Sequence, residues 1–405
     1  MKNLDPSIAI VLMTIMINMM GVGLMWPILP TLVTELTGEN VSNAAAIYGA
    51  TAIIFSLMQF LFAPLMGALS DRFGRRPVML IALLGLGFDT LLIAFAPSIL
   101  WVFIGRAMGG IFGATYSIAS AYIADTMAEK DRAAGFGMIG AAFGIGFIVG
   151  PLVGGFFGEI DTRLPFYIAA ALSFINLILG YFLLKETLPP EKRTNTSLWK
   201  ANPLGTLGLM TSNSVLILLG ITLLLVNAIQ RGMETVWVIF TQYQYGWGLQ
   251  EAGISLAIVG ASYVVVQGFL VRPVIARFGE VKTIIYGFLL SGFMFVILSF
   301  NTSGLIGYIG ILPYVVGWGC AQPALQSIGS RHVAANQQGH LQGALTAVSG
   351  LAAIAGPALS TMSFSFFTAE RAPFDFPGAY FLFGAIIFVI AARIGNAISR
   401  HDTAN

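Results

Sequence analysis

Residues 67–77 read GALSDRFGRRP, a short charged segment between two long apolar stretches. Its four charges fall within the six positions from Asp71 to Arg76, in a chain with only 9% charged and 57% hydrophobic residues. Short loops rich in Lys and Arg stay on the cytoplasmic side of a membrane. We therefore interpret this segment as a tight cytoplasmic turn between two membrane-spanning helices.

The composition excludes a water-soluble globular protein. The mean hydropathy is +0.84, and soluble domains carry about 25% charged residues. One crossing needs ~20 apolar residues, so 405 residues can hold about twelve spans. The net charge of +2 does not indicate a nucleic-acid partner. Cys320 is the single cysteine and the three histidines are scattered, so we expect no metal site and no cofactor.

Apolar runs bounded by charges or by Gly, Pro and Asn predict twelve helices. They cover residues 8–33, 45–69, 77–96, 99–123, 134–157, 164–185, 214–240, 252–274, 282–300, 304–328, 341–365 and 375–397. Most of the Lys and Arg residues outside these runs then fall on one side, and only Arg163 and Arg371 on the other. This asymmetry predicts that both termini are cytoplasmic.

The longest polar stretch separates six predicted spans from six. We expect an N-terminal six-helix bundle at 1–190, a cytoplasmic linker at 191–213 and a C-terminal six-helix bundle at 214–405. The fold class is therefore an all-α membrane protein with twelve transmembrane helices in two bundles.

Two anchors indicate that the second bundle repeats the first. Residues 71–74 (DRFG) align with 276–279 (ARFG) at an offset of 205. The Gly-Pro pair at 150–151 aligns with that at 356–357 at an offset of 206. Parallel repeats of this kind occur in several transporter folds.

Further motifs carry a resemblance to a known family. They are the segment 67–77, GVGLMWPILPT at 21–31, Gly105-Arg106 with Gly109-Gly110, Ala124-Asp125-Thr126, GIGFIVGPLVGG at 144–155, PALQ at 323–326 and QQGHLQG at 337–343. With them the chain resembles transporters of the major facilitator superfamily, and within it the drug:proton antiporters of the tetracycline-exporter type. The resemblance implies proton-coupled export of a hydrophobic or amphipathic compound, such as tetracycline or another drug, by alternating access. It also implies a bacterial cytoplasmic (inner) membrane and a functional monomer.

The resemblance assigns a conformational latch to the charged segment. We expect Asp71 to pair with an arginine or a helix N-terminus across the seam between the halves, with close backbone approach at Gly67 and Gly74. The second copy has Ala276 and Arg272 where the first has the acid and the first glycine, so we expect the latch in the first half. Its residues are Gly67, Asp71, Arg72, Gly74, Arg75, Arg76 and Asp125.

The span at 134–157 carries a glycine stripe. Gly146, Gly150 and Gly154 recur every four residues, so they share one helix face, and Pro151 adds a kink. With Gly155 they form the predicted hinge and packing motif. Either they let a facing helix approach at the seam that opens and closes, or they form an ordinary small-residue packing seam.

Three ionisable residues fall within the predicted spans: Asp89, Arg106 and Glu234. A charge at a helix centre costs about 2.5–3.5 kcal/mol on insertion scales, so each should face the protein interior, a partner or water. The resemblance implies that Asp89 lies in the translocation path and that Arg106 balances a buried acid or relays a proton; a purely structural pair is the alternative. Glu234 lies three residues after Arg231, so it is either a local pair or a proton-carrying acid.

Three positions depart from the tetracycline-exporter pattern. Asn18 and Ser291 stand where those exporters have aspartates, and Tyr263 where they have a histidine. Asn18 can bind a substrate through hydrogen bonds but cannot carry a proton, so the resemblance does not establish a tetracycline–metal chelate as the substrate. The candidates for the substrate cavity are Asn18, Gln59, Asn227, Gln230, Tyr263, Gln267 and Ser291.

The sequence favours export over the other functions that such a membrane protein could have. An importer or symporter of a metabolite would use the same fold, but the Gly-Pro motif at 150–151 favours export. An intramembrane enzyme or a receptor is disfavoured because no zinc motif, no nucleophile with its base and no large soluble domain is present. ATP-driven transport would need a G-x-x-x-x-G-K-[ST] loop, which the sequence lacks. The expected partners are therefore protons, a small hydrophobic substrate and the lipid bilayer.

Overall fold

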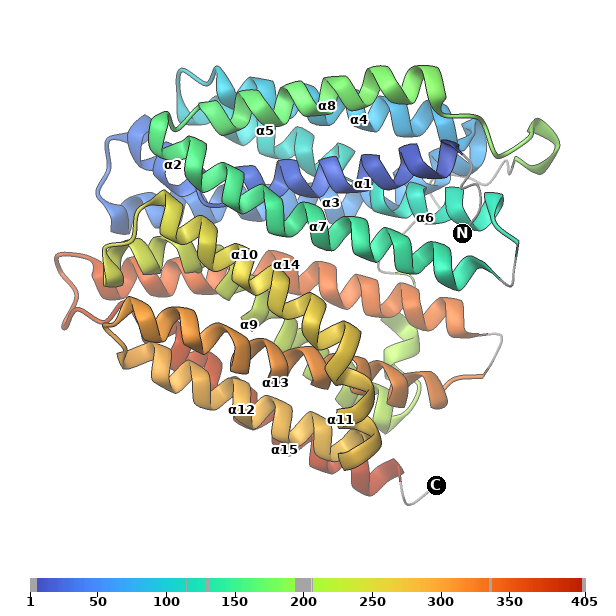
Figure 1. Ribbon diagram of the computed structural model, residues 1–405. Helices are drawn as coiled ribbons and strands as arrows, with labels where there is room; N and C mark the ends of the chain where they lie inside the picture. Colours follow the sequence, from blue (N-terminus) through green and yellow to red (C-terminus); the bar gives the residue numbers. More distant parts are fainter. Residues whose placement is uncertain are drawn as a thin grey trace. The chain divides into compact units, whose positions relative to one another are not determined.

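The computed structural model describes residues 6–113, 115–128, 131–193, 205, 207–334 and 337–402. These residues form helices and connecting turns, with no strand among them. The helices are α1 (Pro6–Met25), α2 (Leu29–Thr37), α3 (Val41–Phe73), α4 (Arg75–Ala94), α5 (Ile99–Phe112), α6 (Thr115–Thr126), α7 (Arg132–Ile160), α8 (Leu164–Leu183), η2 (Pro190–Lys192), η4 (Leu207–Thr211), α9 (Ser214–Tyr245), α10 (Leu249–Val265), η5 (Val266–Leu270), α11 (Val271–Phe278), α12 (Glu280–Phe300), α13 (Gly304–Arg331), α14 (Gln338–Thr368) and α15 (Ala379–Asp402) (Figure 1).

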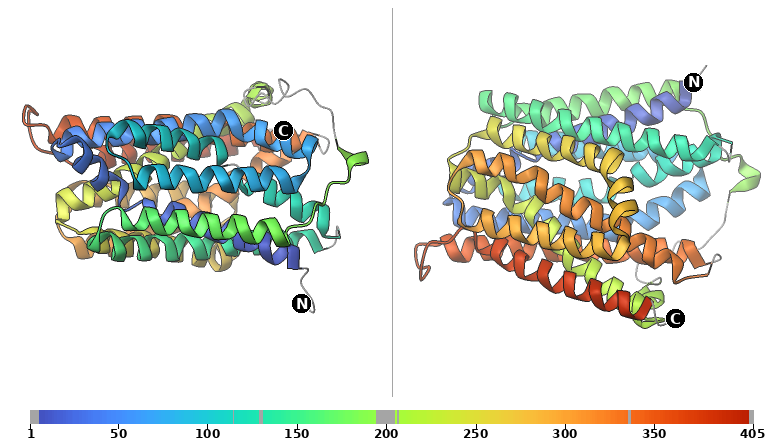
Figure 2. Two further views of the ribbon diagram at one scale, coloured as in Figure 1. Left: turned by 90° about the horizontal axis from the view of Figure 1, so that it is seen from above. Right: turned by 60° about the horizontal axis from the view of Figure 1, so that its bottom comes forward.

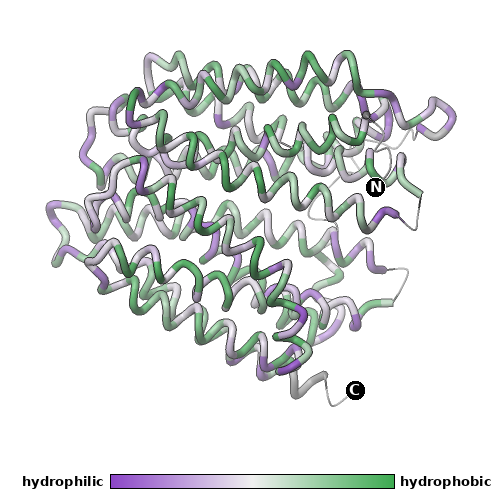
Figure 3. Tube along the Cα trace, in the orientation of Figure 1, coloured by the Kyte–Doolittle hydropathy of each residue, from purple (hydrophilic) through white to green (hydrophobic). Residues whose placement is uncertain are grey.

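Twelve spans in the described part of the chain are long and apolar enough to cross a membrane. Hydrophobic residues dominate along the helices, and hydrophilic residues gather where helices end (Figure 3). Two spans combine several elements: 99–126 contains α5 and α6, and 249–278 contains α10, η5 and α11. The predicted all-α membrane protein with twelve spans is confirmed.

The interruptions of the spans have local causes. The predicted helix at 8–33 is interrupted at residues 26–28, because α1 ends at Met25 and α2 begins only at Leu29. Pro27 lies in that break, where it lacks an N–H to donate to the preceding turn. The predicted helix at 99–123 is likewise broken after Phe112, at Gly113.

The charged turn is much shorter than predicted. Helix α3 continues to Phe73 and α4 begins at Arg75, so only Gly74 is outside a helix. Gly74 has φ of +107°, a conformation that residues with a Cβ rarely adopt. One glycine therefore reverses the chain, and the charges of the segment lie on helix ends.

Unit 1 is a compact unit of residues 1–38, 54–202 and 248–257. Within it α1 packs against α7 and α8, and α4 against α5 and α8 (Figure 1). Its core is a cluster of buried apolar side chains from α1, α4, α6 and α7, which includes Val11, Ile15, Met79, Ala82, Tyr122, Ile123 and Ile139.

Unit 2 comprises residues 39–53, 203–247 and 258–405. Helix α9 packs against α14 and α15, and α12 against α13 and α15; the red α15 runs beside the orange α12 in Figure 2. Aromatic rings fill its core: Phe295 stacks on Tyr314 at 5.1 Å between ring centroids and also contacts Phe381 and Phe388.

Two helices are divided between the units. The first part of α3 belongs to unit 2, where the Ser42 hydroxyl donates to the Thr368 carbonyl of α14 at 2.7 Å. The first part of α10 belongs to unit 1, where the Gln250 N–H donates to Glu159 of α7 at 3.2 Å. The domain boundaries at 190 and 214 stay a prediction, and most of the expected linker lies outside the described residues.

Candidate functional site

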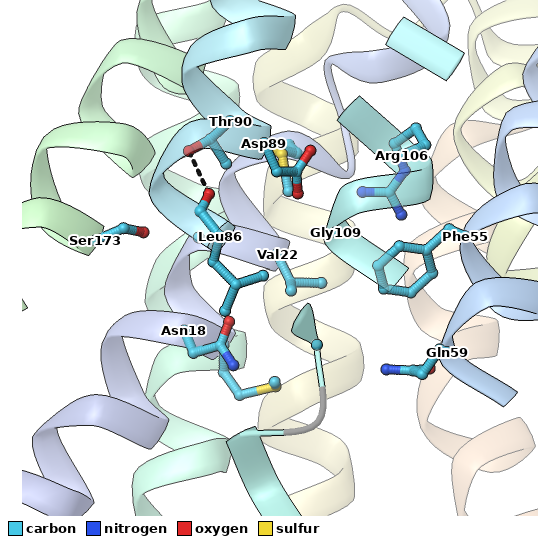
Figure 4. Close-up of a pocket in the computed structure, with 14 residues that line it drawn as sticks. Asn18, Val22, Phe55, Gln59, Leu86, Asp89, Thr90, Arg106, Gly109 and Ser173 are labelled. Carbon is cyan, nitrogen blue, oxygen red and sulfur yellow. Dashed lines mark hydrogen bonds between the residues drawn. The ribbon is translucent and has the colours of Figure 1, made fainter. Parts of the chain in front are cut away.

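A pocket in unit 1 brings together polar residues from four helices (Figure 4). Asn18 comes from α1, Gln59 from α3, Asp89 from α4 and Arg106 from α5. The sequence predicted each of them as a site residue, but the spacing in the chain could not show that they share one pocket. The other lining residues are Met19, Gly21, Val22, Met25, Phe55, Leu86, Thr90, Gly109, Gly113 and Ser173.

Asp89 is the most buried charged group of the pocket, with 1% of its surface exposed. Its carboxylate lies against the Cα of Gly109 on α5, where an added methyl group would collide with it. Its Oδ1 atom is buried and has no hydrogen-bond partner among the described residues. A buried carboxylate oxygen without a hydrogen bond is costly, and a proton or a donor group at Oδ1 would remove that cost.

Arg106 supplies the positive charge of the pocket. Its guanidinium lies over the ring of Phe55, 4.0 Å from the ring centroid, in a cation–π contact. The charge is close enough to Asp89 to interact with it electrostatically, and both side chains face the same pocket (Figure 4). Gly110 lies one turn after Arg106 on α5 and lets this helix approach the backbone of α3 at Phe55.

Asn18 and Gln59 add neutral hydrogen-bonding groups to this pocket. The amide of Asn18 donates to the hydroxyl of Thr115 at the start of α6, which ties α1 to α6. The pocket encloses about 50 Å³, whereas sites for small molecules usually measure ~300–1,000 Å³. The enclosed space therefore admits a water-sized group, such as one donor group of a larger compound, but not a whole drug-sized compound.

The latch residues in unit 1 are organised around Arg75. Its guanidinium donates to Asp71 at 2.5 Å, to Asp125 of α6 at 2.9 Å and to the Ser70 hydroxyl at 2.7 Å. The side chain of Arg75 is nearly buried, while Asp71 is half-exposed. Asp71 pairs with an arginine, as expected, and this arginine is Arg75, which begins α4 in the same unit. The expected contact across the seam between the halves stays a prediction.

Glu186 was missed by the sequence analysis, because an acid shortly after a span carries no distinctive signal. Its carboxylate accepts hydrogen bonds from the backbone N–H groups of Arg75 and Arg76, at 2.9 and 3.3 Å, and so caps the N-terminus of α4. It also accepts from the N–H groups of Thr187 and Leu188. A carboxylate at a helix N-terminus is favoured by the helix dipole.

The other predicted latch residues lie outside the group of side chains that contact the Arg75 guanidinium. Arg76 donates to the carbonyl of Tyr181 at 2.7 Å, and Arg72 lies over the neighbouring ring of Phe73. The expectation of close approach at Gly67 is wrong here, because no described atom lies within 4 Å of a Cβ built on it. At Gly74, by contrast, the Glu186 carboxylate fills the space that a side chain would need.

The glycine stripe of α7 faces α1 inside unit 1. Cβ atoms at Gly146, Gly150 and Gly154 would meet the backbone of α1, at Gly150 within 2.6 Å of the Met20 carbonyl oxygen. These contacts favour the alternative of a small-residue packing seam for the three glycines, here between α1 and α7. The hinge role stays a prediction. Gly155 instead faces the first part of α10, residues 249–253, while Pro151 lies between the two helices, with its ring against Gly23 of α1 and its carbonyl oxygen near Gly253 of α10.

Unit 2 holds a second polar group of residues on α9. Arg231 and Glu234 form an ion pair at 2.9 Å, which confirms the predicted local contact. Gln230 donates to Glu234 at 3.2 Å and accepts from the hydroxyl of the buried Tyr314. The pair is thus anchored to α13 through a glutamine and a tyrosine.

The remaining polar candidates of unit 2 join helices. Asn227 lies 3.5 Å from the hydroxyl of Ser349 on α14, and Gln267 donates to the Gly319 carbonyl at 3.1 Å. Ser291 is completely buried and donates to the carbonyl of Tyr314. Tyr263 differs from these, because it is 37% exposed and packs on Trp318.

An ion pair between Glu280 and Arg331 was also missed. The Arg331 guanidinium donates to Glu280 at 2.5 Å and joins the start of α12 to the end of α13. The Ser327 hydroxyl donates to the same carboxylate at 2.6 Å. The repeat offsets of 205 and 206 place these two residues opposite Arg75 and Asp125, and would have found the pair.

Proteins with similar sequences are resistance proteins. The chain is 35% identical to the class C tetracycline resistance protein of Escherichia coli, over 95% of both chains. It is 37% identical to the class G tetracycline resistance protein of Vibrio anguillarum, over 96% of both. Multidrug resistance protein 1 of Bacillus subtilis is 28% identical, over 90% of this chain and 91% of that one.

Solved structures share the fold. The human organic anion transporter MFSD10 superposes with a TM-score of 0.69 at 24% identity, over 96% of this chain and 99% of that one. The nucleoside transporter NupG superposes with a TM-score of 0.78 at 16% identity, over 96% and 98%. Residues 11–357 match the sequence pattern of the Major Facilitator Superfamily. The chain therefore belongs to the Major Facilitator Superfamily and is a membrane transporter rather than an enzyme.

Proposed function

We propose that this transporter exports a hydrophobic or amphipathic compound, such as tetracycline or another drug, in exchange for protons. It works by alternating access in a bacterial inner membrane, as a monomer with both termini in the cytoplasm. The relatives support this proposal, because those at 35–37% identity are named for tetracycline resistance and a more distant one for multidrug resistance.

The observation that carries the proposal is the carboxylate of Asp89. It is almost fully buried, and one of its oxygens has no hydrogen-bond partner among the described residues. A proton removes the cost of that buried charge, and so does a donor group of a substrate. One carboxylate cannot satisfy both demands at once, and antiport requires this mutual exclusion.

Arg106 makes the exchange reversible. Held over the Phe55 ring beside the same pocket, its charge stabilises Asp89 when the proton leaves. Gly109 allows the acid to approach α5. Asp89, Arg106 and Glu234 are the proposed proton-coupling residues, and the first two share one pocket.

Efflux from energised cells or inverted vesicles tests the proposal. Tetracycline and hydrophobic dyes are loaded, and export is measured with and without a protonophore. We expect Asp89→Asn to abolish gradient-dependent export while the protein still inserts and retains its thermal stability. The matched control is Glu191→Gln, which removes an exposed acid of the same unit outside the predicted spans and should export normally.

Two results would contradict the proposal. Normal export by the Asp89→Asn variant would show that another group couples the proton. Accumulation of the test compound that rises with the proton gradient would instead identify an importer with the same fold.

A further inference from the structure

Helix α11 of unit 2 has two chemically different faces. It follows the π-helix η5, turns away from the line of α10 (Figure 1) and contacts α12 and α13. The helical period places four apolar residues on one face, Val271, Val274, Ile275 and Phe278. The opposite face carries Arg272, Pro273, Ala276 and Arg277, and all four are exposed. Helix α11 is therefore amphipathic, and no described residue covers its basic face.

The cations of this region lack acidic partners. Arg272 and Arg277 of α11 are exposed, and so is Lys282 in the first turn of α12. Their side chains form no ion pair within the described part of the chain. Glu280 is the acid nearest to them in the sequence, and its carboxylate already pairs with Arg331. Three positive charges are thus left for a group from outside the protein.

The internal repeat shows that this excess of charge belongs to the second copy. In the first copy Asp71 pairs with Arg75, so the cation has an acid beside it. The position equivalent to Asp71 is Ala276, and the position equivalent to Gly67 is Arg272. The second copy has therefore lost an acid and gained a base on the same exposed helix face.

Aromatic side chains border the cations. Phe269 of η5 is 73% exposed, and the exposed rings of Phe278 and Tyr286 contact each other at 6.3 Å between centroids. The guanidinium of Arg277 lies 6.0 Å from the centroid of the Phe278 ring. Amphipathic helices with Arg or Lys on one face and Phe or Leu on the other lie in the membrane interface. Basic clusters in this position attract anionic lipids.

We propose that the surface formed by Arg272, Arg277, Lys282, Phe278 and Tyr286 binds an anionic phospholipid of the inner leaflet. The two guanidinium groups and the ammonium group donate to the phosphate oxygens, and the two rings pack against the glycerol and the upper acyl chains. This inference goes beyond drug export. It takes from the proposed function only the orientation that places this end of unit 2 in the cytoplasmic leaflet.

Native mass spectrometry of the purified full-length transporter tests the proposal, with phosphatidylglycerol and phosphatidylcholine as probes. We expect the Kd for phosphatidylglycerol to be lower than that for phosphatidylcholine. The variant Arg272→Gln with Arg277→Gln should raise it about tenfold or more, because each basic side chain at an anionic lipid surface contributes about a fivefold factor. The Kd for phosphatidylcholine should not change. The matched control is Arg132→Gln with Lys185→Gln, which removes two exposed cations of unit 1 and should leave both values unchanged.

A single substitution tests the missing acid without removing a cation. Ala276→Asp restores the carboxylate of the first copy on the exposed face that carries Arg272 and Arg277. The new charge pairs with the arginines and repels the lipid phosphate, so the Kd for phosphatidylglycerol should rise severalfold. Ala276→Asn has nearly the same size and no charge, and it should bind as the native protein does. Position 276 is exposed, so both variants keep the packing of α11.

Four results would overturn the proposal. They are an unchanged Kd in the double arginine variant, an equal rise in the unit 1 control, equal binding of the two lipids by the native protein, and binding of glycerol 3-phosphate as tight as that of phosphatidylglycerol. The last result would identify a site for a soluble phosphate compound instead of a lipid. Lipid binding needs neither a proton gradient nor a drug, so its outcome is independent of the efflux assay for Asp89.

A depth measurement tests the position of this surface. Cys320 is the only cysteine of the chain, so Cys320→Ser provides a background without cysteine. In that background nitroxide labels on Phe278→Cys and on Arg272→Cys are compared by electron paramagnetic resonance in bilayers that contain phosphatidylglycerol. The label at 278 should be more accessible to oxygen, which concentrates in lipid, and the label at 272 to a water-soluble nickel chelate. Equal access of the chelate to both labels would overturn the proposal.

Discussion

The ion pair between α4 and α6 and the one between α12 and α13 occupy equivalent places in the repeat, with their charges reversed. In unit 1 a cation, Arg75, begins α4 and an anion, Asp125, lies at the end of α6. In unit 2 an anion, Glu280, begins the helix and a cation, Arg331, ends the partner. At the positions that the repeat offsets pair, each unit joins its helices by an ion pair, and the residues that make it differ.

The helix dipole makes the two pairs unequal. An anion is favoured at a helix N-terminus and a cation at a C-terminus, by about 0.3–1 kcal/mol each at exposed sites. The pair in unit 2 follows this preference and the pair in unit 1 opposes it. Unit 1 compensates with two further acids, since Asp71 also pairs with Arg75 and Glu186 caps the N-terminus of α4.

The difference suggests different roles for the two links. The arginine in unit 1 is nearly buried and holds three side chains at once, so its geometry depends on all of them. The arginine of the unit 2 pair is half-exposed, and its glutamate also accepts from the Ser327 hydroxyl. We therefore expect substitutions in the unit 1 ion pair to lower stability strongly, and substitutions in the unit 2 ion pair to lower it only slightly.

The largest expected effect comes from removing the two arginines separately. Arg75→Gln removes a nearly buried guanidinium from two partly exposed carboxylates and a hydroxyl at once, so it should cost more than the loss of one exposed pair. Arg331→Gln breaks a half-exposed pair, which is worth about 0–1 kcal/mol. Thermal unfolding of the purified proteins should show a much larger fall in Tm for the first variant. Equal falls would contradict the distinction between the two links.

The next effect concerns the two glycines before these helices. Gly74 and Gly279 have φ of +107° and +75°, so alanine is strained at both, by about 1–2 kcal/mol. A Cβ at Gly74 would also collide with the Glu186 carboxylate, whereas Gly279 has no described atom within 4 Å of such a group. Gly74→Ala should therefore lower Tm and transport more than Gly279→Ala. The reverse order would show that the glutamate does not cap α4.

Exchanging the two charges within each ion pair tests whether the helix ends and the neighbouring acids fix their order. Glu280→Arg and Arg331→Glu should each reduce stability, and the double variant should recover most of the loss except for the dipole term of about 0.3–1 kcal/mol per helix end. The same exchange in unit 1, Arg75→Asp with Asp125→Arg, should not recover, because a new carboxylate at the start of α4 would meet Asp71 and Glu186. A double-mutant cycle based on Tm measures the recovery of stability in each unit. Recovery in unit 1 would contradict the role given to the two acids.

The smallest effect is expected at Gly67. It lies inside α3 with no described atom near its missing side chain. Alanine is favoured over glycine in a helix interior by about 0.5–1 kcal/mol, so Gly67→Ala should keep or slightly raise Tm. Its equivalent position already carries Arg272 in unit 2. A clear fall in Tm would show that Gly67 is packed after all.

The candidate site was only partly predictable. Asp89 and Arg106 stand out in the sequence because charges within an apolar span are costly and therefore rare. The role of Gly109 beside Asp89, and of Phe55 beneath Arg106, depends on how α3, α4 and α5 pack. Glu186 lies 111 residues after Arg75 in the chain, and nothing in its local sequence indicates that contact.

The sequence by itself determined the membrane class, the number of spans and a chain reversal within residues 67–77. These follow from hydropathy, span length and the conformational freedom of glycine, which are local properties of the chain. The tertiary structure decided which charges meet, that the α7 glycines face α1, and that Asn18, Gln59, Asp89 and Arg106 line one pocket. Such contacts depend on the rotation and packing of helices far apart in sequence, and hydropathy alone does not specify these.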